Sequence, residues 1–159
     1  MNTLDIYSLV KNLESHDIYT LLKNRGVEIY HMPEMFRCLP SDARIITDLY
    51  GNTSIFLRFR PGEKPRYEVF ILWHELGHIE TQGRMPHSRS YNLSTHSSND
   101  EADPNLFAFF GTARSYSKLS DTSDDIASQL GMPMIILESV MNRINSDDEF
   151  MNYLNEETK

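Results

Sequence analysis

Three residues between Arg66 and Gly83 could hold and use a metal ion: His74, Glu75 and His78, which form the pattern HExxH. Residues four positions apart on an α-helix lie on one face about one turn apart, so both imidazoles can reach the same ion while Glu75 flanks it. Neutral imidazoles suit zinc, and a catalytic zinc takes three protein ligands and keeps a fourth position for water. The pattern predicts a zinc site in which Glu75 is the general base and then the acid for the leaving amine.

The segment that carries these residues has the features of a buried helix. Pro65 fits the first turn, where its missing N–H costs nothing, and Gly83 fits the position just past the end. Apolar residues occupy most of the helix surface around the histidines: Val69, Phe70, Ile71, Leu72, Trp73, Leu76 and Ile79. Two histidines on such a helix need partners inside the protein, and a metal ion would satisfy both.

A third ligand is expected among the acidic residues that follow the second histidine. Glu101 and Asp103 are the candidates, and their spacing from the HExxH pattern does not choose between them. Two helix starts are compatible with this stretch. Ser98 with Glu101 fits an N-cap with its capping-box partner, whereas Asp103 followed by Pro104 fits a later start with proline at the first position. In both interpretations Glu101 has a purely structural alternative role.

Residues 83 to 98 form a polar stretch that indicates a loop longer than most loops within compact domains. His87, Tyr91 and His96 lie in it and are candidates for an oxyanion donor or a supporting group. Each has a plainer interpretation as a solvated loop residue. His31 could also approach the metal site. A histidine at the end of a strand is, however, a weak candidate for a ligand.

Composition and charge limit the classes of function that this chain can have. The chain has 159 residues, 40% of them apolar, and a formal charge of −8 without a basic stripe, so we expect one domain that does not bind nucleic acid directly. There is no signal-peptide pattern and no apolar run long enough for a membrane span. Cys38 is the only cysteine. These features predict a soluble, cytoplasmic protein.

The pattern of the whole chain predicts the α+β class. Residues 1–26 are expected to form two helices and residues 27–60 a small antiparallel sheet with a hairpin turn at Gly51-Asn52. Residues 65–113 would form the helices of the metal site and residues 122–156 the C-terminal helices. The sheet is expected to pack on the HExxH helix, with a protein segment bound along the edge of the hairpin. The C-terminal helices carry too many acidic side chains for a DNA-binding pair.

With HELGH and a second motif about two dozen residues later, the sequence resembles the ImmA/IrrE metallopeptidases, small zinc-dependent proteins typical of bacterial mobile elements and phages. The second motif of that family reads approximately E-x-x-A-N-x-F-A. Here the stretch from Glu101 to Ala108, EADPNLFA, keeps the Glu, Asn, Phe and Ala in register. Pro104 stands where the family prefers Ala. The resemblance covers about residues 40 to 145 and is specific only over these two motifs.

The resemblance implies a gluzincin-like site with one Zn²⁺ per chain and Glu101 as the third ligand. It also implies a protein partner, a transcriptional repressor of the same mobile element, which family members cleave or relieve by binding. We therefore expect a zinc endopeptidase that acts on a protein. One alternative is an anti-repressor that binds the repressor without cleaving it, and in which the metal site only stabilises the fold. Another is a metal-free domain in which HELGH is coincidental.

Overall fold

The computed structural model describes residues 1–32, 42–83, 87–91 and 99–158. Two short helices open the chain, α1 (Thr3–Lys11) and α2 (Ile18–Asn24), as expected for residues 1–26. Each begins at a polar cap that the sequence supplies, because the side chain of Asn2 accepts from the Asp5 N–H and that of Asp17 from the Tyr19 and Thr20 N–H groups.

A four-stranded sheet follows, with β1 (Val27–His31), β2 (Ala43–Thr47), β3 (Thr53–Leu57) and β4 (His87–Tyr91) in the order β1-β3-β2-β4. The predicted hairpin is present as the antiparallel pair β2 and β3. The sheet as a whole is mixed, because β1 pairs in parallel with β3. The prediction of an antiparallel sheet was therefore wrong for β1. This strand pairs with β3 although β2 lies between them in the sequence, and local sequence patterns do not reveal such a pairing.

The strand β4 corrects a second prediction, that residues 83 to 98 are all loop. Residues 87–91 pair antiparallel with β2, in the register that sets His87 opposite Thr47 and Tyr91 opposite Ala43. The stretch HSRSY lacks the apolar alternation of a half-buried strand, and it gains its place through backbone pairing. As a result the hairpin strands β2 and β3 are central, and the edges of the sheet are β1 and β4.

The helix α3 (Pro65–Gln82) packs on one face of this sheet and carries the HExxH pattern. It begins at Pro65, and Gly83 follows its end with a φ of 77°, as the sequence predicts. Every residue from Phe70 to His78 is buried.

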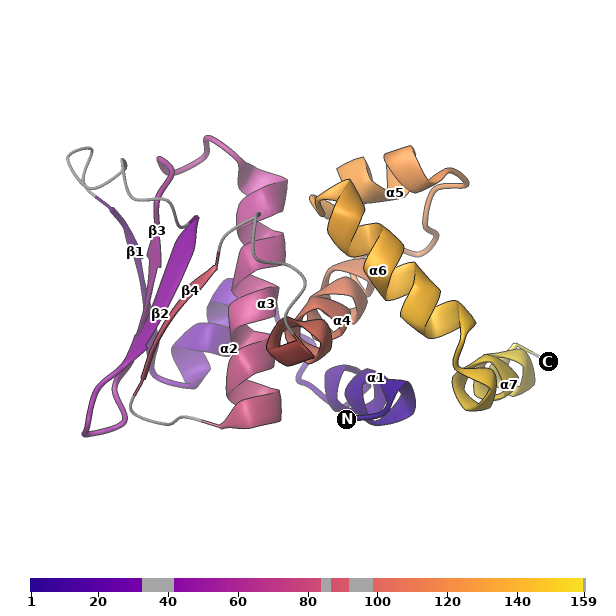
Figure 1. Ribbon diagram of the computed structural model, residues 1–159. Coiled ribbons are helices and arrows are strands. Elements are labelled where there is room, and N and C mark those ends of the chain that lie inside the picture. Colours follow the sequence, from indigo (N-terminus) through magenta and orange to yellow (C-terminus); the bar gives the residue numbers. More distant parts are fainter. Residues whose placement is uncertain (33–41, 84–86, 92–98, 159) are drawn as a thin grey trace.

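On the far side of α3 lies α4 (Asn99–Ala113), followed by α5 (Ser123–Leu130), α6 (Met134–Asn145) and α7 (Asp148–Glu157). Figure 1 shows α3 between the sheet and the helices α1, α4, α5 and α6, with α2 beside it on the side of the sheet, so that α3 is covered on both sides. Pro104 lies inside α4 and not at its first position, so the later of the two predicted helix starts was wrong. Ser98, the cap in the other interpretation, lies outside the described residues. The C-terminal helices fall within the predicted range of 122–156, apart from the last residue of α7.

Two glycines let α3 and α4 approach closely. A Cβ atom on Gly77 would lie 3.0 Å from Cα of Pro104, and one on Gly111 would lie 2.3 Å from the ring of Trp73. Gly77 is part of the HELGH motif itself, so the HExxH turn of α3 faces the turn of α4 that holds Pro104. This contact places the first turns of α4 beside the two histidines.

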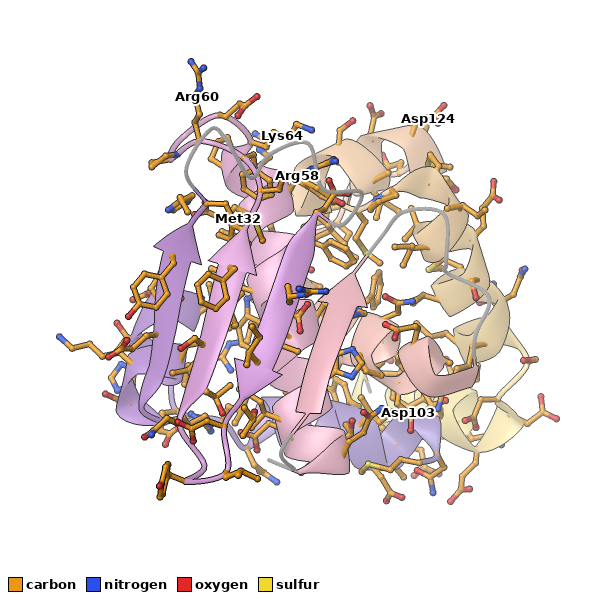
Figure 2. All side chains as sticks on the ribbon, turned by 60° about the vertical axis from the view of Figure 1, so that its left-hand side comes forward. Met32, Arg58, Arg60, Lys64, Asp103 and Asp124 are labelled. Atoms are coloured by element: carbon orange, nitrogen blue, oxygen red, sulfur yellow. The ribbon has the colours of Figure 1, made fainter. Side chains whose placement is uncertain are left out.

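Charged side chains of both signs lie toward the two ends of the sheet. Arg58, Arg60 and Lys64 gather at the end of the sheet where α3 begins, whereas Asp103 lies toward the opposite end (Figure 2). Arg58 is paired there with the buried Asp42, whose second carboxylate oxygen accepts from Tyr67 of α3. In the described part of the chain, no helix is long and apolar enough to cross a membrane.

Candidate metal centre

Two helices supply the three side chains of the site. His74 and His78 lie one turn apart on α3, and Glu101 reaches them from the first turn of α4. The side chains of the two histidines are 0% and 4% exposed and that of Glu101 is 19% exposed. Within the described part of the chain, these three residues form the one group of His, Cys, Asp or Glu side chains that could hold a metal ion.

The three ligand atoms form a nearly equilateral triangle. Nε2 of His74 lies 3.1 Å from Nε2 of His78, and Oε2 of Glu101 lies 3.0 Å from the first and 3.3 Å from the second. A tetrahedral zinc ion with bonds of about 2.0–2.1 Å keeps its ligand atoms about 3.3 Å apart. The spacing of the triangle is therefore close to the spacing that three ligand atoms of one zinc ion would have.

The tautomers of both histidines suit this geometry. Nδ1 of His74 lies 2.9 Å from Oδ1 of Asn105, and Nδ1 of His78 lies 3.1 Å from Oε1 of Gln82. Because an amide oxygen only accepts, each Nδ1 carries the hydrogen, and each Nε2 of a neutral ring is left with a lone pair. Two lone pairs and a carboxylate thus converge on one point, as metal ligands held by outer partners do.

The environment of the triangle favours neutral histidine at His74. Burial lowers the pKa of His74 to about 4, although Glu101 and Asn105 act in the opposite direction. Burial by itself would raise the pKa of Glu101, but the two imidazoles beside it hold that pKa well below its usual range. Among the described residues, none forms a hydrogen bond of regular geometry with the buried Oε2 of Glu101. A cation at the centre of the triangle would satisfy this oxygen.

Glu75 adds a second acidic side chain to the site. It is 1% exposed and lies on α3 between the two histidines in sequence. Burial alone would lower the pKa of His78, but Glu101 and the negative charge of Glu75 raise it. Two carboxylates and two imidazoles inside the protein are a donor set whose charge a divalent cation balances.

Asp103, the alternative ligand, is directed elsewhere. Its carboxylate lies 2.8 Å from Nη1 of Arg143 on α6 and 2.8 Å from the amino group of Met1. Although partial burial alone would raise the pKa of Asp103, these two cations lower it. Asp103 therefore links α4 to α6. Glu101, two residues earlier on the same helix, points instead to the two histidines.

The remaining candidates are not part of the described triangle. His87 and Tyr91 lie at the two ends of β4, opposite Thr47 and Ala43, and only their backbone is described. His96 lies outside the described residues, as does Cys38. His31 is held elsewhere, with its Nε2 2.6 Å from Oε1 of the buried Glu68 near the start of α3.

Sequence reasoning missed the two amide side chains that orient the histidines. Asn105 was part of the second motif, but the sequence assigns it no partner. Gln82 follows His78 by four residues on the same helix, so the i,i+4 rule could have paired them. The contact between Asn105 and His74 depends on how α4 crosses α3, and only the fold reveals it.

No protein-family model, curated protein sequence or solved structure matches this chain. The resemblance to the ImmA/IrrE metallopeptidases therefore remains an expectation from the two motifs. The structure itself shows a buried group of two histidines and a glutamate, consistent with a metal site of the HExxH type.

Proposed function

We propose that this chain is a zinc-dependent endopeptidase that acts on a protein partner. The observation that carries the proposal is the triangle of His74, His78 and Glu101, with a buried Glu75 next to it in the HExxH turn. The two motifs on which the resemblance to the ImmA/IrrE family rests support it, because three of these four residues form HExxH and the fourth is the Glu of the second motif. That family also points to a transcriptional repressor as the partner.

His74, His78 and Glu101 would hold the ion, and Asn105 and Gln82 would keep the two rings in the ligating tautomer. When bound, zinc supplies a Lewis acid that lowers the pKa of water toward neutrality and polarises a carbonyl. Glu75 takes a proton from the attacking water and returns it to the nitrogen of the leaving amine. A carboxylate in a water-poor site is suited to both steps.

An extended substrate segment has a place to bind at the edge strand β4. This strand follows α3 in the chain and precedes α4, and β2 occupies its other edge. No described strand occupies the outer edge of β4, and strand addition to such an edge supplies backbone hydrogen bonds that do not depend on the substrate sequence. The expected position of the substrate is thus β4, in place of the hairpin edge that the sequence suggested.

The test is the variant Glu75→Gln, which preserves the shape of the side chain and removes its base. Wild-type protein and variant are loaded with zinc, incubated with candidate repressor proteins, and followed by mass spectrometry of the products. We expect the variant to keep about one zinc per chain and to lose cleavage by a factor of about 10² or more, the usual size of a general-base contribution. Cleavage by the variant at the wild-type rate would overturn the role of Glu75.

A second function is favoured by the enclosure of the site, because both histidine side chains are at most 4% exposed. A metal ion held between α3 and α4 would join two helices of the core and contribute folding energy without turnover. The chain would then relieve a repressor by binding it. In that case Glu75→Gln would retain the effect on the repressor in full while no product of cleavage appears.

A further inference from the structure

The edge strand β1 has a row of backbone groups with which no described strand pairs. On one side β1 pairs with β3 along its whole length, and its other side is an edge of the sheet. The N–H of Met32, just after β1, donates to the carbonyl oxygen of Leu57 in β3. The backbone groups of successive residues in a strand point alternately to its two sides. Those of Val27, Ile29 and His31 therefore face outward, away from β3.

A groove of about 400 Å³ runs along this outer edge, between β1 and α2. Tyr19 and Lys23 of α2 form one wall, and the β1 residues from Val27 to Tyr30 form the other. Natural proteins usually protect an edge strand by a proline or a lysine within it, or by a bulge. β1 includes no proline or lysine, and its pairing with β3 has no bulge. The outer edge of β1 is thus open to pairing with another strand.

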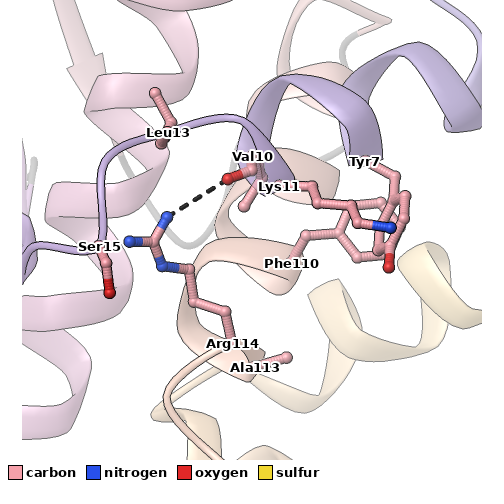
Figure 3. Close-up of a pocket in the computed structure, with 8 residues that line it drawn as sticks. All are labelled: Tyr7, Val10, Lys11, Leu13, Ser15, Phe110, Ala113 and Arg114. Carbon is pink, nitrogen blue, oxygen red and sulfur yellow. Dashed lines mark hydrogen bonds between the residues drawn. The ribbon is translucent and has the colours of Figure 1, made fainter.

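The pocket between α1 and α4, of about 440 Å³, differs from this groove because its cations have partners within the chain (Figure 3). Lys11 lies 2.6 Å from Glu157. The guanidinium of Arg114 donates to the carbonyl oxygen of Val10, as the dashed line in Figure 3 shows. The outward backbone groups of β1, in contrast, call for one kind of partner, which is another extended strand.

The strand β1 is complementary to a second copy of itself. When two β1 strands run antiparallel about Ile29, Val27 of each copy lies opposite His31 of the other, and Ile29 lies opposite its counterpart. The residues whose backbone groups face outward then all form hydrogen-bonded pairs, with two bonds in each pair. Glu28 of each copy lies opposite Tyr30 of the other, so that no two carboxylates stand opposite each other.

Other ways of joining two copies fit less well. A shift by one residue would set the outward-facing groups opposite groups that face β3, and the hydrogen bonds would be lost. Pairing about Glu28 would set two carboxylates directly opposite each other, which is destabilising. Pairing of β4 with itself about its central residue would likewise set Arg89 opposite Arg89 of the second copy. The edge of β1 is therefore better suited to a second copy than the edge of β4.

We propose that two copies of this chain join through their β1 edges, antiparallel and centred on Ile29, so that their two sheets become one continuous sheet. The two contacts are equal, and a two-fold axis closes the dimer. Ile29 is only half-buried in the single chain, and its counterpart would cover the rest of its side chain. The contact goes beyond the proposed activity and does not depend on it, because β4 lies at the opposite edge of the sheet.

Disulfide trapping tests the register. In a Cys38→Ser background, one protein carries Glu28→Cys and a second carries Tyr30→Cys, both at exposed positions, and the two are mixed under mild oxidation. The proposed pairing sets these two positions opposite each other, with Cα atoms about 4.5 Å apart, which a disulfide can bridge. Two copies of the same variant would have their cysteines on a diagonal of about 7–8 Å, which is too long.

We expect the mixed disulfide to form at least about tenfold faster than the disulfide of either variant with itself. Equal rates would overturn the proposal, as would faster trapping of Glu28→Cys with itself, because that outcome belongs to pairing about Glu28.

Sedimentation equilibrium of the full chain over a wide range of concentration gives an independent readout, in which the mass is expected to rise toward that of a dimer. Ile29→Pro removes an outward-facing N–H from each copy without removing a hydrogen bond to β3. We expect it to raise the dissociation constant by about tenfold or more, since two hydrogen bonds are lost. Ile29→Val keeps the N–H and is the matched control, which should leave the dissociation constant unchanged.

Far-UV circular dichroism shows whether both variants keep the fold, and trapping decides the question if Ile29→Pro unfolds. A wild-type chain that stays monomeric, or a dimer that a folded Ile29→Pro variant does not weaken, contradicts the inference.

Discussion

Oδ1 of Asn105 on α4 lies 2.9 Å from Nδ1 of His74 on α3, and this contact turns the opposite nitrogen of the ring toward His78 and Glu101. Asn105 is 5% exposed, so the bond is made inside the core. One amide thereby fixes both the tautomer and the orientation of a metal ligand. His78 has an equivalent partner in Gln82, at the end of its own helix.

Removing these amides should weaken metal binding without breaking the fold. We expect Asn105→Leu and Gln82→Leu each to lower zinc affinity by about 10–100-fold, the usual cost of losing an outer partner of a ligand histidine. Competition with a chromophoric chelator measures the affinity. Asn155→Leu, at an exposed position of α7, is the matched control and should bind zinc as the wild type does. If both amide variants bind zinc with the affinity of the wild type, then Asn105 and Gln82 do not orient the histidines for metal binding.

The crossing of α3 and α4 sets how close Glu101 comes to the histidines. At Gly111 an added Cβ would lie 2.3 Å from the ring of Trp73, which is itself buried at 2% exposed. We expect Gly111→Ala to lower the free energy of unfolding by about 1–3 kcal/mol, as overpacking of a core does. Urea denaturation of the zinc-free protein measures this. A variant as stable as the wild type would show that the two helices can separate at little cost.

The turn of the hairpin should show a dependence on pH. Hydrogen bonds from the side chain and backbone of Asn52 lower the pKa of Asp48 below 3.8, its ordinary value. A carboxyl whose pKa is lower in the folded state stabilises the fold fully above its unfolded pKa, and this contribution is lost as the pH falls through the folded pKa. The stability difference between wild type and Asp48→Ala should therefore be constant above about pH 5 and shrink below pH 3.8.

Denaturant unfolding of both proteins across this range of pH measures that difference. A gap that grows as the pH falls would have the wrong sign for a carboxylate stabilised in the turn. It would show that the hydrogen bonds of Asp48 are not what holds residues 48–52.

Much of the metal centre was predictable because it depends on local spacing. The helical interval between His74 and His78 and the breakers at Pro65 and Gly83 are properties of one segment, and the structure has that helix with these ends. The choice between Glu101 and Asp103 was open from spacing alone, because both lie near the start of α4. The fold separates them, since the helix turns one carboxylate to α3 and the other to Arg143.

What the sequence did not reveal depends on partners that are distant in the chain. The parallel pairing of β1 with β3 and the addition of β4 to β2 are set by tertiary packing, and HSRSY has no strand periodicity of its own. Pro104 also misled the prediction of α4, because a proline inside a helix costs a hydrogen bond that local rules count heavily. Here Pro104 packs over Gly77 at the crossing of the two helices, so tertiary contact outweighs local preference.

The measurement that tests the central claim most directly is the zinc content of the purified protein, determined by elemental analysis under zinc-replete conditions. It is made on the wild type, Glu101→Ala and Asp103→Asn. The account predicts about one zinc per chain in the wild type and in Asp103→Asn, and a loss of most of the zinc in Glu101→Ala. A wild-type chain without zinc, or full zinc content in Glu101→Ala, would contradict a site built from His74, His78 and Glu101.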